Sequence, residues 1–159
     1  MKYFFIIILS ACVIAAGRIF AEKYKREVKL CEGFITFLSF AEAELPYNPQ
    51  TAFEMLNRFE KLNPNTLPFF KNISEPVYIS ISENLKTEYA LSPKQKRLIN
   101  EFFCSFGSGD ENSSLKLIKN YRSLFGAELE ECRKNCTQKI KLITRLSFLC
   151  AAGVAVILF

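Results

Sequence analysis

The chain of 159 residues contains no histidine and no tryptophan. Histidine is the side chain whose unperturbed pKa lies nearest neutral pH, and it is the commonest protein ligand of metals such as zinc. Its absence argues against an enzyme that moves protons near neutral pH and against a histidine-bound metal centre. We therefore expect no enzymatic activity, no metal and no cofactor.

The six cysteines do not form the framework of a small disulfide-stabilised protein. Cys12 and Cys150 lie inside apolar runs, while Cys132 and Cys136 lie four residues apart. Two thiols at this spacing face the same way on a helix, yet structural zinc normally requires four sulfur or nitrogen ligands. We expect this pair to pack between helices and the cysteines to be free thiols in a reducing compartment.

Charge is missing from both ends of the chain, since residues 3–17 and 146–159 contain no charged side chain. Basic residues follow the first of these runs from Arg18 to Lys29 and precede the second from Arg133 to Arg145. With a modest net charge of +5, this distribution suits a membrane surface better than a nucleic-acid groove. We expect a membrane partner and no nucleic acid, because no nucleic-acid-binding motif is evident.

These ends predict three segments: a transmembrane helix over residues 1–21, a cytoplasmic helical domain over 22–141 and a second transmembrane helix over 142–159. The central domain is placed in the cytoplasm because basic flanks stay there. The last segment is short, about 27 Å as a helix against a hydrocarbon core of roughly 30 Å, so Arg145 would have to reach back to the headgroups. A rival hypothesis is an exported lipoprotein with an extracellular helical binding domain, because residues 9–12 resemble a lipobox ending at Cys12.

Apolar spacing between the two ends predicts helices. One helix continues from the first membrane segment to Pro46, and Asn48-Pro49 is favoured as the start of a second. Residues 77–81 alternate as a strand might, but no partner strand is evident, so a helix after Pro76 is preferred. Ser92 begins a clear capping box, and residues 107–109, Gly-Ser-Gly, are expected to end the helix that follows.

Residues 110–159 contain no proline and are predicted to form one helix, capped by Asp110 and roughly 75 Å long. The fold class is therefore an all-α, membrane-anchored antiparallel bundle whose long C-terminal helix runs into a terminal transmembrane segment. The helices on either side of the Gly-Ser-Gly turn must be antiparallel neighbours. Their apolar faces predict a shared interior containing Phe102, Phe106, Phe125 and Leu129.

The order of short motifs along the chain resembles the stage III sporulation protein AB family of endospore-forming bacteria. The resemblance covers the full length and rests on Gly17-Arg18, on residues 40–47 (FAEAELPY), on residues 102–110 (FFCSFGSGD) and on residues 145–149 (RLSFL). The sequence departs from the family pattern at Ser114, where glutamine is usual, and at Ser147, where glycine is usual.

The resemblance implies a non-enzymatic component of a secretion-like channel assembly between mother cell and forespore. The soluble part of the family is similar to the cytoplasmic domain of the type II secretion and type IV pilus inner-membrane platform protein. The implied partners are the other stage III sporulation proteins, including a cytoplasmic secretion-type ATPase, and self-association is open. Within the matching motifs, the candidate interaction residues are Glu42, Glu44, Tyr47, Asp110 and Arg145.

Two interpretations of the residue 42–47 block remain open. In the first, its side chains contact partner proteins. In the second, the carboxylates merely solvate a helix end and Tyr47 packs at a turn. Glu42 and Glu44 are two residues apart and point to nearly opposite sides of a helix, so they cannot form a catalytic acid/base pair.

Overall fold

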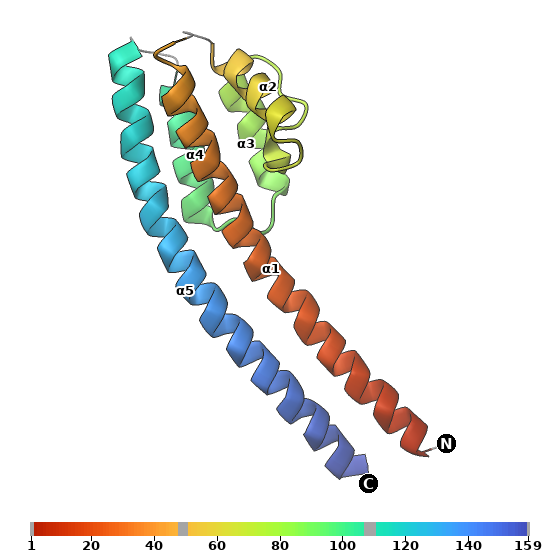
Figure 1. Ribbon diagram of the computed structural model, residues 1–159. Helices are drawn as coiled ribbons and strands as arrows, with labels where there is room; N and C mark the ends of the chain where they lie inside the picture. Colours follow the sequence, from red (N-terminus) through yellow and green to blue (C-terminus); the bar gives the residue numbers. More distant parts are fainter. Residues whose placement is uncertain (1, 48–50, 107–110, 159) are drawn as a thin grey trace. The chain divides into compact units, whose positions relative to one another are not determined.

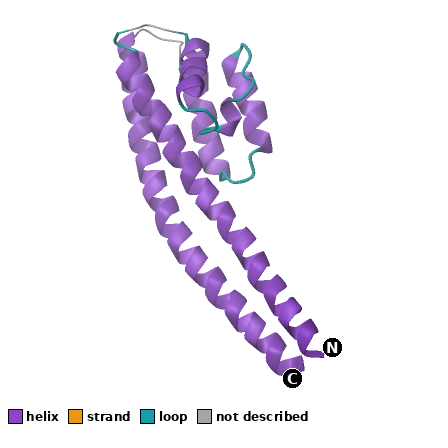
Figure 2. Ribbon diagram, turned by 45° about the vertical axis from the view of Figure 1, so that its right-hand side comes forward, coloured by secondary structure: helices purple, strands orange, loops and turns teal. Residues whose placement is uncertain are grey.

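The computed structural model describes residues 2–47, 51–106 and 111–158. In these ranges the chain forms five α-helices and one short 3-10 helix, without any strand (Figures 1 and 2). They are, in order, α1 (Lys2–Glu44), α2 (Ala52–Leu62), η1 (Pro68–Phe70), α3 (Val77–Thr87), α4 (Pro93–Ser105) and α5 (Glu111–Leu158). The all-α class and the single long C-terminal helix are confirmed.

The helices are divided between two compact units. The bundle unit comprises Lys29–Glu130, and the helix-pair unit comprises Met1–Val28 with Glu131–Phe159. The long helices α1 and α5 contribute one part to each unit.

The helix starts in the bundle unit follow from local capping chemistry. Ser92 and Gln95 form the expected capping box, in which the Gln95 amide donates to Ser92 Oγ at 3.3 Å and the Ser92 amide donates to Gln95 Oε1 at 2.9 Å. The second helix begins later than predicted, because Thr51 and Glu54 form another capping box there. Asn48-Pro49, the start favoured from the sequence, lies outside the described residues.

The segment whose sequence alternates as a strand might is helical. Residues 77–81 belong to α3, which begins directly after Pro76, so the helix is confirmed over the strand. The Asn84 amide donates to the carbonyls of Phe69 at 3.1 Å and Lys71 at 3.0 Å, which fastens α3 to η1. Helix α3 also packs against α4.

Phenylalanine rings fill the interior of the bundle unit. The ring of Phe34 on α1 lies 4.5 Å from that of Phe125 on α5 and 5.8 Å from that of Phe102 on α4, measured between centroids. Phe37 continues the cluster toward η1, with its ring 4.9 Å from that of Phe70. The four residues expected in one interior are all buried: Phe102, Phe106, Phe125 and Leu129. That prediction is confirmed.

In the helix-pair unit the first part of α1 and the last part of α5 run side by side, with both chain ends at the same end of the pair (Figures 1 and 2). A side chain on Gly17 would place its Cβ 3.1 Å from Ser147 Cβ, so the helices approach closely at this level. Further along the pair, Lys139 Nζ lies 4.7 Å from the centre of the Tyr24 ring.

Within the described part of the chain, no helix contains a stretch long and apolar enough to cross a bilayer. The transmembrane segments at residues 1–21 and 142–159 stay predictions from the sequence.

Candidate functional site

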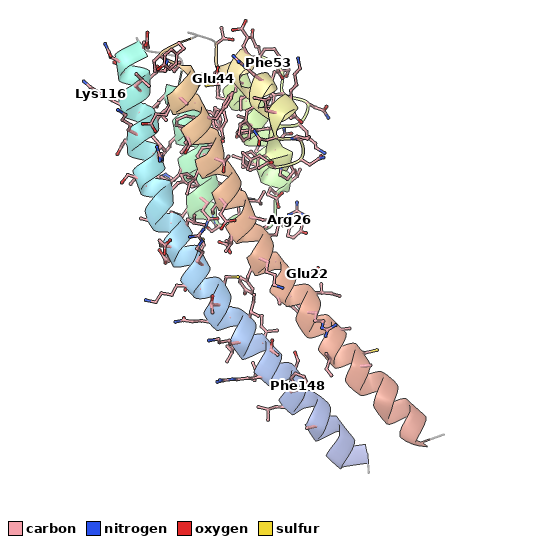
Figure 3. The ribbon with its side chains drawn as sticks, viewed as in Figure 1. Glu22, Arg26, Glu44, Phe53, Lys116 and Phe148 are labelled. Carbon is pink, nitrogen blue, oxygen red and sulfur yellow. The ribbon has the colours of Figure 1, made fainter. Side chains whose placement is uncertain are left out.

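Two carboxylates near the carboxyl end of α1 are each bound by an arginine from a different helix. Glu42 Oε2 accepts a hydrogen bond from Arg122 of α5 at 2.5 Å, and Glu44 Oε2 lies 2.8 Å from Arg58 of α2. The carboxyl end of α1, near the label of Glu44 in Figure 3, is thereby connected to both neighbouring helices. The carboxylates do not share a reaction centre, because each has its own cation.

These ion pairs position the carboxylates more than they stabilise the fold. The side chains of Glu42 and Glu44 are 25% and 28% exposed, and their arginine partners are 49% and 44% exposed. Pairs with this much access to water typically contribute about 0–1 kcal/mol to stability. Both carboxylates therefore remain at the surface, each directed toward its arginine.

Tyr47 lies just beyond α1 and is 90% exposed. Its backbone amide donates to the Glu44 carbonyl at 3.1 Å, so the residue is held by a turn although its side chain is in solvent. The interpretation that Tyr47 packs at this turn is wrong. The exposed tyrosine therefore presents an apolar ring and a hydroxyl to solvent.

The structure groups three of the five candidate residues. Glu42, Glu44 and Tyr47 all lie at the carboxyl end of α1, where Glu42 is directed toward α5 and Glu44 toward α2, and we call these three residues the α1-end face. Asp110 lies outside the described residues, and Arg145 is an exposed residue of the helix-pair unit. Arg58 and Arg122 could not be found by sequence reasoning, because they reach Glu44 and Glu42 from helices distant in sequence.

A second surface feature is a shallow hollow of about 550 Å³ along α4. Asn100 lines it, and among the described residues Asn100 Oδ1 is an inaccessible oxygen without a hydrogen-bond partner. Arg97 and Glu101, which lie four residues apart on α4 and also line the hollow, pair at 2.7 Å, and hydrogen bonding to Glu101 raises the pKa of Arg97. Nearby, burial raises the pKa of Tyr121, and the charge of Glu101 adds to that effect.

A comparison with known protein families identifies the family of this chain. The family model described as stage III sporulation protein AB matches residues 2–159. The chain belongs to the stage III sporulation protein AB family. No curated protein and no solved structure matches the chain significantly. This membership confirms the resemblance seen in the motifs and implies a role in stage III of sporulation. The family is not a known enzyme family.

The cysteines of this stage III AB family member are free thiols. Cys132 Sγ lies 3.7 Å from Glu27 Oε1 in the helix-pair unit. The pKa of the Cys136 thiol is raised, mainly by burial. The positive charge of Lys25 opposes this increase, and the negative charge of Glu27 adds to it. The described residues contain no group of three or more side chains that could hold a metal ion.

Proposed function

We propose that the protein is a non-enzymatic membrane component of a sporulation-specific, secretion-like channel assembly between mother cell and forespore. In this role it acts as a platform that binds other stage III proteins and a cytoplasmic ATPase. The observation that carries the proposal is the α1-end face, which combines an exposed tyrosine with two carboxylates paired to arginines of different helices, in a chain that matches the family over residues 2–159.

The chemistry of the α1-end face suits a protein contact. Tyrosine brings a large apolar ring and a hydroxyl to an interface at little entropic cost, and it is enriched among residues that dominate binding. Glu42 and Glu44 already have arginine partners, so their directions are set before a partner arrives. Each pair presents a carboxylate next to a guanidinium, so a partner surface with charges of both signs complements it, and such complementarity favours fast and specific association.

Membrane attachment is the second part of the proposal and rests on the sequence. The charge-free residues 3–17 and 146–159 are the anchors, and the basic residues beside them remain on the cytoplasmic side. Within the helix-pair unit both chain ends lie at the same end (Figure 1). This arrangement is required if both ends of the chain enter the membrane from the same side. The bundle unit is then cytoplasmic, on the mother-cell side of the forespore envelope.

Replacing Tyr47 by alanine tests the face without disturbing the fold, because the side chain is 90% exposed. We expect co-purification with stage III partners from sporulating cells to fall about tenfold or more, since a binding hot spot contributes at least about 2 kcal/mol. The matched control is Tyr78→Ala on α3, where the removed tyrosine is 48% exposed. Equal recovery of partners with both variants would contradict the interface.

A charge exchange separates the fold from the contact. In the double variant Glu42→Arg with Arg122→Glu, the ion pair between α1 and α5 is kept with its ends exchanged. We expect unchanged thermal unfolding and a loss of partner recovery. If the exchanged chain and Tyr47→Ala both retain their partners, the α1-end face is not the platform surface.

A further inference from the structure

The helix-pair unit contains a hollow of about 290 Å³ between its two helices. It lies beside the close approach of Gly17 and Ser147, and the labelled Phe148 marks its level in Figure 3. Its lining also includes Ile14, Arg18, Glu22 and Lys25. A volume of this size is near the lower end for ligand sites, so it can hold a headgroup but not a whole lipid.

The lining changes in character along the hollow. The contact of Gly17 with Ser147 and that of Tyr24 with Lys139 set an antiparallel register for the two helices. In this register Ile14 and Phe148 lie at the end nearer the chain termini, and Lys25 lies toward the other end. The hollow is therefore apolar at one end and charged at the other.

The charged part of the hollow suits one negative charge. Arg18 and Lys25 supply two positive charges and Glu22 removes one, which leaves one in excess. No described carboxylate forms an ion pair with Arg18 or Lys25, so both cations can meet an external anion. A guanidinium can bind a phosphate through two hydrogen bonds, while an ammonium acts as a point charge.

The surroundings of the hollow point to a lipid. Large apolar side chains are exposed at the same level on the faces of both helices that point away from the hollow, with Ile19 at 69%, Phe20 at 66% and Leu146 at 50%. The apolar run of residues 3–17 ends directly beside Arg18. Basic pockets between helices at the cytoplasmic side of a bilayer are suited to anionic headgroups.

We propose that this hollow binds the phosphodiester of an anionic phospholipid. Arg18 and Lys25 hold the phosphate, and the acyl chains leave past Ile14 and Phe148. The site rests on the membrane attachment proposed above. It would fix the depth and rotation of the helix pair at the bilayer surface.

The test is a lipid titration of the purified full-length chain in detergent, followed by native mass spectrometry with phosphatidylglycerol as the probe. The site variant is Arg18→Gln with Lys25→Gln. The matched control is Lys23→Gln with Lys141→Gln, which removes the same charge from exposed positions of the same unit outside the hollow. We expect binding by the site variant to be about tenfold weaker than by the control, because each basic residue near a membrane surface contributes roughly 1 kcal/mol.

Three further measurements define the outcome. Arg18→Lys with Lys25→Arg keeps both charges and should bind within about threefold of the wild type. Equal weakening of phosphatidylglycerol binding in the site and control variants would overturn the site. Displacement of the bound lipid by inorganic phosphate at the same concentration would also overturn it, because the hollow would then not distinguish a lipid from free phosphate. Membrane attachment is tested separately, by washing membranes that contain the wild-type chain with carbonate. Release of the wild type would refute the anchors. Retention of the wild type, together with equal lipid binding by the site and control variants, would refute only the lipid site.

Discussion

Replacing Phe34 by alanine is expected to destabilise the bundle unit by about 3–5 kcal/mol. The side chain is fully buried on α1 and contacts rings from both α4 and α5. Its removal leaves a cavity among residues that are themselves held by other rings, such as Phe37 and Phe103, which lie 5.8 Å apart between centroids. The neighbours therefore cannot collapse fully into the space.

The loss is measured by guanidinium unfolding of the full-length chain in detergent, followed by the circular dichroism of its helices. Leu62→Ala is the control, because this residue ends α2 with its side chain 62% exposed, and a change within about 0.5 kcal/mol is expected there. A loss below about 1 kcal/mol for Phe34→Ala would show that the ring cluster does not hold the bundle together.

Replacing Gly17 by leucine is expected to push α1 and α5 apart within the helix-pair unit. The new side chain would meet Ser147, whose Cβ already lies 3.1 Å from the position of an added Cβ. Overpacking of this kind costs typically about 1–3 kcal/mol when the helices cannot yield. The matched control is Gly153→Leu on α5, since a Cβ at that residue has nothing within 4 Å.

The separation is measured as the distance between spin labels on cysteines that replace Lys23 and Gln138, both exposed residues of this unit. We expect the distance to lengthen and broaden in Gly17→Leu and to stay unchanged in Gly153→Leu. The pair Gly17→Ala with Ser147→Gly exchanges the small residue between helices and should restore the native distance. An unchanged distance in Gly17→Leu would mean that the contact does not set the spacing of the helices.

Local rules predicted most of the helical content. The capping box of Ser92 with Gln95 and the helix after Pro76 depend on residues near one another in sequence, so the sequence alone indicated both. The start of α2 was misplaced because Asn48-Pro49 and Thr51 are both good helix-start signals within four residues. The capping partner Glu54 favours Thr51 in the structure.

The candidate site was less predictable, because its geometry depends on how helices are rotated against one another. The motif around Glu42 and Tyr47 could be found from the sequence, but its arginine partners could not. Arg122 is far from Glu42 in the chain, and only the packed register of α1 and α5 brings them together. The approach of Gly17 to Ser147 has the same origin, since apolar periodicity locates a helix face but not the residue opposite it.

The most direct test of the account is the side of the membrane on which Cys104 lies. This cysteine is exposed on α4, so it reports on the bundle unit without a new substitution. Cys12 is also kept, the other four cysteines are replaced by alanine, and one cysteine is added after Phe159. Sporulating cells are then treated with a membrane-impermeant maleimide, and the labelled peptides are identified by mass spectrometry.

The account predicts that the added terminal cysteine is labelled in intact cells, while Cys104 reacts only after the cells are opened. The peptide containing Cys12 should be unmodified and joined to the residues before it. Labelling of Cys104 in intact cells, with an acylated Cys12 as the first residue of the chain, would contradict a cytoplasmic platform and establish the exported lipoprotein.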